Sequence, residues 1–139
     1  MSQTVLVTAL SIAFGFAIPA QAQEKVSFPS TDGDLKGGVP TTVSAYLYKP
    51  AGAGPFAAVV ALHGCDGVAD QDGKVRPLYA SWAETLSKDG YIVLLPDSLG
   101  SRGHGNVCAI QPISARPVQA DREIPRDNYG ALAYLGTRS

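Results

Sequence analysis

The sequence predicts an α/β domain built on a mostly parallel sheet with helices on both faces. Residues 57–62 (AAVVAL) and 91–95 (YIVLL) are apolar without alternation, which is typical of parallel strands covered on both sides. Residues 78–89 lie between them and show helical spacing of apolar side chains. Strand, helix and strand in this order predict a right-handed crossover unit with parallel strands, and 139 residues suffice for one such domain.

Two earlier segments predict antiparallel strands through which the chain enters this sheet. Residues 43–48 alternate apolar and polar side chains, as a half-buried antiparallel strand does. Residues 24–29 are short and mixed, and they fit an edge strand. Turn-forming residues fill 30–40 and 50–55, which separates the strands from each other.

The expected inner faces of two helices follow from their apolar spacing. In residues 78–89 this face comprises Leu78, Tyr79, Trp82, Ala83 and Leu86, and Gly90 ends the helix. A second helix is expected from about residue 121 or 125 to residue 135, with the inner face Ile124, Tyr129, Leu132 and Leu135. Between the second apolar strand and this helix, residues 98–120 form a long irregular stretch, and loops of that length usually carry function.

Residues 1–22 have the pattern of a secretory signal peptide. Residues 5–18 are almost wholly apolar, and Pro19 and then Ala20-Gln21-Ala22 follow, with small residues at both positions that a signal peptidase reads. We expect cleavage before Gln23 and an exported protein, periplasmic or secreted, without stable membrane anchoring afterwards. An uncleaved anchor and a buried core helix are the alternatives, but 14 apolar residues are short for a membrane span.

The mature part contains two cysteines, Cys65 and Cys108. In an oxidising compartment two cysteines predict one disulfide, and two separate buried thiols are the alternative. The net charge of −1, with no basic stripe, argues against a nucleic-acid partner. Two distant histidines leave no zinc set and no nucleotide-binding motif is complete, so we expect neither a metal nor a cofactor.

The candidate chemistry lies in His63-Gly64-Cys65-Asp66-Gly67, directly after the first apolar strand. Glycine there lets the main chain turn sharply and present N–H groups at the carboxyl edge of the sheet, where α/β folds bind ligands. Such amides can stabilise a developing oxyanion in acyl transfer. An ordinary strand-to-helix turn has the same composition, so the spacing alone leaves both interpretations open.

Three stretches together resemble the dienelactone hydrolase family of the α/β-hydrolase superfamily, in its exported members. They are residues 50–67 (PAGAGPFAAVVALHGCDG), 81–103 (SWAETLSKDGYIVLLPDSLGSRG) and 126–135 (RDNYGALAYL). The resemblance covers most of the chain from about Val43 to Leu135. It implies a cofactor-independent hydrolase of a small-molecule ester or lactone with a Ser or Cys nucleophile, an Asp and a His. It also implies that Gly64 and Cys65 form the oxyanion-hole turn and that Arg102 grips a substrate carboxylate.

Two features depart from the family pattern. The glutamate that cytoplasmic members carry near the position of His63 and Gly64 is absent, which argues against dienelactone itself as the substrate. The nucleophile elbow G-x-[SC]-x-G is also absent, and in the superfamily the nucleophile precedes the acid and the histidine. We therefore expect residues 23–139 to be the N-terminal half of the hydrolase sheet, ending before the elbow, without a triad and inactive alone.

Two alternatives remain open. Cys65 could act as the nucleophile with His104 as its base, although a disulfide to Cys108 would block this. The chain could instead be a non-enzymatic, hydrolase-like binding module that uses its cleft only to hold a ligand.

Overall fold

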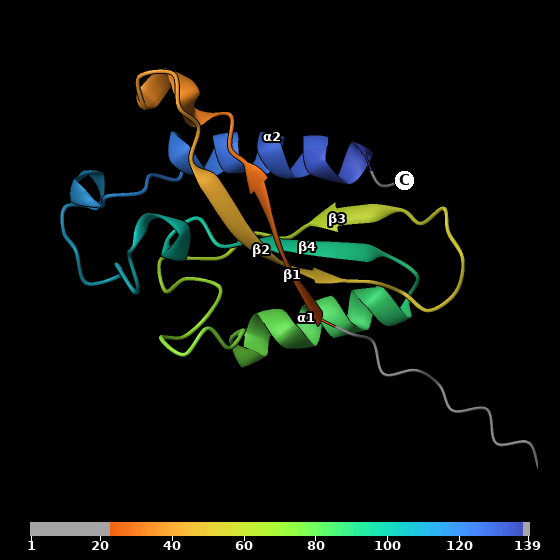
Figure 1. Ribbon diagram of the computed structural model, residues 1–139. Coiled ribbons are helices and arrows are strands. Elements are labelled where there is room, and N and C mark those ends of the chain that lie inside the picture. The colour runs from red at the N-terminus through yellow and green to blue at the C-terminus, as the bar shows by residue number, and fades with distance from the viewer. Residues whose placement is uncertain (1–22, 138–139) are drawn as a thin grey trace, which may run out of the picture.

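The computed structural model describes residues 23–137 as a four-stranded sheet with one helix on each face (Figure 1). The strands are β1 (Gln23–Pro29), β2 (Thr42–Tyr48), β3 (Ala58–Val60) and β4 (Ile92–Pro96), in the spatial order β1-β2-β4-β3. The helices are α1 (Pro77–Lys88) and α2 (Glu123–Gly136), and short 3₁₀ turns lie at Asp32–Leu35 (η1), Gly100–Arg102 (η2) and Ile113–Ala115 (η3). The predicted signal peptide, residues 1–22, lies outside the described residues.

The predicted mostly parallel, α/β-hydrolase-like sheet is wrong, because the sheet is mixed and mainly antiparallel. β1 pairs antiparallel with β2, and β2 pairs antiparallel with β4. Only β3 and β4 run parallel, joined by α1 as the strand–helix–strand pattern predicts. A continuous apolar run indicates that a strand is covered on both faces, but it does not indicate whether each neighbouring strand runs parallel or antiparallel. β4 accordingly has one parallel and one antiparallel neighbour.

Burial of the strands also differs from the prediction. β2 is buried on both faces instead of half-buried, since Tyr46 and Tyr48 are only 2% and 3% exposed beneath α1. Their hydroxyl groups are satisfied, because Tyr46 donates to Gly73 O and Tyr48 donates to Gln23 Oε1. β3, predicted to be covered on both sides, is a three-residue strand at the edge of the described sheet, and Leu62 beyond it is 51% exposed.

Both helices lie close to their predicted positions, and part of each predicted inner face is confirmed. Tyr79, Ala83 and Leu86 of α1 pack against the core, as do Ile124 and Leu135 of α2. The other predicted members are exposed instead. Leu78 and Trp82 of α1 are 63% and 61% exposed, and Tyr129 and Leu132 of α2 are 66% and 56% exposed. α2 instead packs against the sheet through small residues and one paired charge, namely Asp127, Gly130, Ala131 and Leu135.

The glycine in this face has a steric reason. A Cβ atom at Gly130 would collide with the main-chain oxygen of Pro29 at the end of β1. α2 therefore approaches β1 more closely than any larger residue permits, and this contact sets the rotation of the helix about its axis.

The core consists of three apolar clusters. One lies between the sheet and α2, and the second lies between the sheet and α1. The third is small and comprises Leu99, Val107 and Val118, with Cys65 and Ile124 packed against it. This third cluster gives the long segment between β4 and α2 a core of its own at the carboxyl edge of the parallel strands. Neither α1 nor α2, the two helices of the described part, is long and apolar enough to cross a membrane.

Candidate functional site

The turn after β3 is linked to the end of β4 through His63. Nε2 of His63 accepts a hydrogen bond of 3.2 Å from the main-chain N–H of Ser98, and Nδ1 lies 2.7 Å from Gly64 O. Because Nε2 is the acceptor, we assign the ring proton to Nδ1, which then donates to Gly64 O. Both ring nitrogens are thus occupied by main-chain groups, and His63 is a structural link between the two parallel strands.

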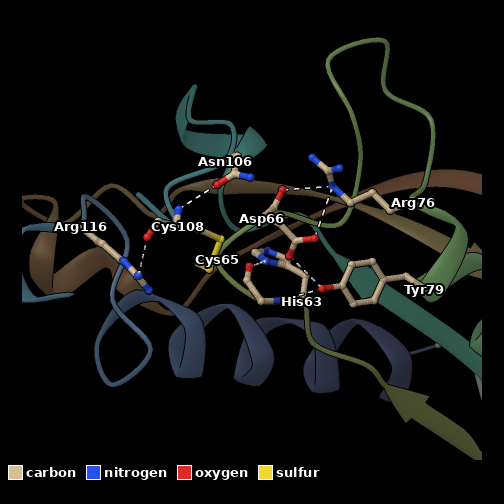
Figure 2. Close-up of a disulfide and its surroundings, with 9 residues drawn as sticks. His63, Cys65, Asp66, Arg76, Tyr79, Asn106, Cys108 and Arg116 are labelled. Carbon is tan, nitrogen blue, oxygen red and sulfur yellow. Dashed lines mark hydrogen bonds and ion pairs between the residues drawn. A yellow bond between two sulfur atoms is a disulfide. The ribbon is translucent and has the colours of Figure 1, made fainter. Parts of the chain in front are cut away.

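The same turn is linked to the start of α1. Gly64 N donates to the hydroxyl oxygen of Tyr79 at 2.9 Å, and that hydroxyl donates to Asp66 Oδ1 at 3.2 Å. Arg76 Nε donates to Asp66 O at 3.1 Å (Figure 2). The Gly64 amide, a predicted oxyanion donor, is therefore already used by Tyr79.

The predicted disulfide between Cys65 and Cys108 is confirmed, with the Cα atoms 4.9 Å apart. It joins the turn after β3 to the long segment after β4, and Val107 N donates to Cys65 O at 2.8 Å beside it. Arg116 Nη2 donates to Cys108 O at 3.1 Å on the other side (Figure 2). With the disulfide intact, neither sulfur is a thiolate, so Cys65 is not a nucleophile in this state.

The main-chain N–H of Cys65 differs from that of Gly64. It donates to no acceptor within residues 23–137. A cavity of about 120 Å³ adjoins the turn, and its walls are mainly apolar: Leu99, Val107, Ile113, Val118 and Ile124. An unpaired amide on a rigid turn beside a small apolar cavity is an arrangement that can bind a carbonyl oxygen and the alkyl group attached to it.

Arg102 in η2 lies in a buried ion-pair cluster, which we call the arginine cluster: Arg102, Asp32 and Asp127. The Arg102 side chain is 8% exposed. Its Nη1 and Nη2 donate to the two carboxylate oxygens of Asp127 at 2.8 Å each, and Nη2 also donates to Asp32 Oδ2 at 2.8 Å. The guanidinium that the resemblance assigns to a substrate carboxylate is thus occupied by two carboxylates of the chain itself.

Hydrogen bonds decide the ionisation of this cluster. Burial opposes the charged form of Asp32, but bonds from the hydroxyl and the amide of Thr41 and from Arg102 outweigh it and lower the pKa of Asp32 to about 2. Burial likewise opposes the charge of Arg102, and its bonds to Asp127 and Asp32 raise its pKa above the ordinary value. Asp32 and Arg102 are therefore both charged at neutral pH.

A second cavity of about 440 Å³ lies beside the arginine cluster and is polar. Its lining includes Lys36, Ser101, His104 and Arg122 together with Asp32 and Arg102. His104 therefore lines a different cavity from Cys65, and the structure does not bring together the pair considered as nucleophile and base. Across residues 23–137 no three His, Cys, Asp or Glu side chains are grouped as metal ligands would be.

The sequence analysis missed the arginine cluster. Its members come from the β1–β2 connection, from η2 and from α2, and no local spacing relates them. No protein-family model matches the chain, and no curated protein matches it. A function must therefore be argued from the geometry of the site.

Proposed function

We propose that the chain contributes the carbonyl-binding part of an exported hydrolase of small carboxylic esters or lactones, of dienelactone hydrolase type. The observation that supports this most is the main-chain N–H of Cys65, which has no acceptor in the described part of the chain and lies on a turn beside the 120 Å³ apolar cavity. The cavity suits a short alkyl or acyl group and not an extended one.

Rigidity of the turn supports an oxyanion role. The disulfide, the link from His63 to Ser98 and the bond from Gly64 to Tyr79 hold the turn from three sides. A donor that is already in position needs no reorganisation when charge develops on the substrate oxygen, and removing one such donor typically costs about 10²–10³ in rate.

The proposed reaction requires a nucleophile and a base that the residues next to the Cys65 amide do not supply. Ser98 is buried, Cys65 is oxidised, and both ring nitrogens of His63 are occupied. A second candidate function follows from the same observation: a non-catalytic module that binds a carbonyl ligand at the Cys65 turn without hydrolysing it.

We also propose that residues 1–22 are removed on export and that the mature protein begins at Gln23 in the periplasm or outside the cell. The Cys65–Cys108 disulfide is compatible with such an oxidising location.

A titration with a small lactone tests the carbonyl site. We expect γ-butyrolactone to shift the main-chain amide resonance of Cys65 in ¹⁵N-labelled protein, with the amide of Gly130, which lies where α2 packs against β1, as an internal control. p-Nitrophenyl acetate should not be hydrolysed above the buffer rate at this turn, because Cys65 is oxidised and both ring nitrogens of His63 are occupied. A lactone that shifts residues elsewhere and leaves Cys65 unchanged would contradict the proposal. Saturable hydrolysis that Cys65→Ala abolishes would contradict the assignment of Cys65 as an amide donor only.

A further inference from the structure

Arg116 is the one arginine of residues 23–137 whose charge has no carboxylate partner in that range. The range contains five arginines, and each of the other four forms an ion pair with an Asp or Glu side chain. Arg116 instead donates one hydrogen bond, from Nη2 to the main-chain oxygen of Cys108. Its Nε is buried and has no acceptor in the described part of the chain. Because a buried donor without a partner destabilises the protein, this N–H favours an acceptor supplied by a ligand.

The side chain of Arg116 borders the 120 Å³ cavity beside the Cys65 turn. Arg116 and Cys65 both line this cavity, and most of its other walls are apolar. Figure 2 shows Arg116 beside the disulfide, joined by its hydrogen bond to Cys108. The main-chain N–H of Cys65 likewise has no acceptor among residues 23–137. Two unpaired donors, one of them cationic, therefore adjoin a single small apolar cavity.

Both donors are held in place by neighbouring groups. The disulfide and the main-chain bond from Val107 N to Cys65 O hold the Cys65 turn. The main-chain N–H of Arg116 donates to Ile113 O at 3.1 Å, and its main-chain oxygen accepts from Nε2 of Gln119. Both donors and all the lining residues lie within residues 63–124, so further residues after α2 are not needed to form the cavity.

Charge, donor number and volume together select a class of ligand. A cationic N–H and an amide N–H require an anion with two acceptor oxygens, and bonds from a guanidinium to a carboxylate are among the stronger hydrogen bonds in proteins. The apolar walls require an alkyl group attached to that anion, which inorganic phosphate lacks. The volume of about 120 Å³ is well below the roughly 300–1,000 Å³ of common ligand pockets, which limits the alkyl group to a few carbons.

We propose that this cavity binds a short-chain monocarboxylate, with its carboxylate on Arg116 Nε and the Cys65 N–H and its alkyl group between the apolar walls. The proposal rests on the proposed function in one respect, since it also uses the Cys65 N–H as a ligand donor. It goes further because a neutral ester or lactone leaves the charge of Arg116 unpaired. A short carboxylate is the acid that hydrolysis of a small ester releases, so the same cavity that holds the ester carbonyl also holds the product.

Titration of ¹⁵N-labelled protein with butyrate and with butyramide tests the site. The two compounds have the same carbon chain, but at about pH 7 butyrate is ionised and butyramide is neutral. We expect butyrate to shift the Arg116 Nε–H and the Cys65 amide resonances together, and to bind roughly tenfold or more tightly than butyramide. The Nε–H of Arg102 is the internal control, because it is also buried without a partner but belongs to the arginine cluster, and it should not shift.

Substitution of Arg116 tests the assignment of the cation. Arg116→Met should weaken butyrate binding roughly tenfold or more, read from the Cys65 amide, and should change butyramide binding little. Arg122→Met is the matched control, because Arg122 is exposed, pairs with Glu123 and does not line this cavity, so butyrate affinity should stay unchanged. Circular dichroism verifies that each variant is folded, and the comparison of butyrate with butyramide needs only the wild-type protein.

Three results would overturn the proposal: equal affinities for butyrate and butyramide, the same shifts from inorganic phosphate, or unchanged butyrate affinity in Arg116→Met. γ-Butyrolactone separates this site from the proposed function. Binding of butyrate without binding of the lactone would retain the carboxylate site and contradict the carbonyl site. Binding of the lactone without binding of butyrate would retain the carbonyl site and contradict the carboxylate site.

Discussion

Two linkages meet at Ser98, directly after β4, and they hold the loops of this end of the sheet by different means. On one side, Ser98 N donates to His63, next to the disulfide and the Cys65 turn. On the other side, Ser98 O accepts a 2.9 Å hydrogen bond from Arg102 of the arginine cluster. The first linkage includes the disulfide and leaves the main-chain N–H of Cys65 without an acceptor among residues 23–137. The second pairs buried charges of opposite sign and leaves only the buried Nε of Arg102 without a hydrogen bond in the cluster.

Under the proposed function, this difference favours the Cys65 turn over the arginine cluster as the ligand-binding region. The guanidinium of Arg102 already donates hydrogen bonds to two carboxylates, so few of its N–H groups remain for a ligand. The charges around Arg102 therefore stabilise the fold. The unpaired N–H of Cys65, in contrast, can still donate a hydrogen bond to a ligand. The three predictions that follow test this division of roles, from the largest expected effect to the smallest.

Loss of the arginine should have the largest effect on stability. Arg102→Met leaves Asp32 and Asp127 buried without a cation, and we expect the free energy of unfolding to fall by about 3–5 kcal/mol. Urea denaturation measures this change. Arg126→Met is the matched control, because Arg126 also donates two hydrogen bonds to one carboxylate, that of Asp34, but this pair is exposed. The control substitution should change the free energy of unfolding little. Equal losses in the two variants would contradict a special role for burial.

Loss of the disulfide should have a smaller and more local effect. The bond closes a loop of 43 positions, and the double variant Cys65→Ser/Cys108→Ser should lose about 2–4 kcal/mol of stability. Hydrogen exchange should accelerate in residues 63–67 and 103–120, while the amides around Asp127 keep their protection. Equal acceleration in both regions would show that the two linkages do not act separately.

Acid should weaken the arginine cluster and not the disulfide. The folded-state pKa of Asp32 is about 2, below the ordinary 3.8, so the folded state binds this proton less readily than the unfolded state. The contribution of Asp32, about 2 kcal/mol, is therefore present above pH 4 and is lost as the pH falls toward 2. Urea denaturation from pH 5 to pH 2 should show this loss, and Asp32→Asn should have a shallower pH dependence. An identical slope in the variant would assign the effect to other carboxylates.

Local patterns were sufficient for the positions of most elements and for the disulfide. Runs such as AAVVAL and YIVLL mark β3 and β4 because the apolar content of a strand is a property of neighbouring residues. The Cys65–Cys108 bond was predicted from the presence of two cysteines and an expected export signal, without any knowledge of the fold. The turn at His63–Gly67 was likewise identified from its glycines and its place after a strand.

Contacts between residues far apart in the sequence decided the strand directions, the rotation of α2 and the arginine cluster. The directions of β2 and β4, the exposure of Tyr129 and Leu132, and the partners of Arg102 depend on residues far away in the chain. α2 is turned by the approach of Gly130 to Pro29 and by the burial of Asp127 against Arg102, and neither contact has a signal in the spacing of apolar residues. Periodicity describes only how apolar side chains recur along one segment. Which element packs against each face depends on distant residues that pair with its buried charges and fit its close contacts.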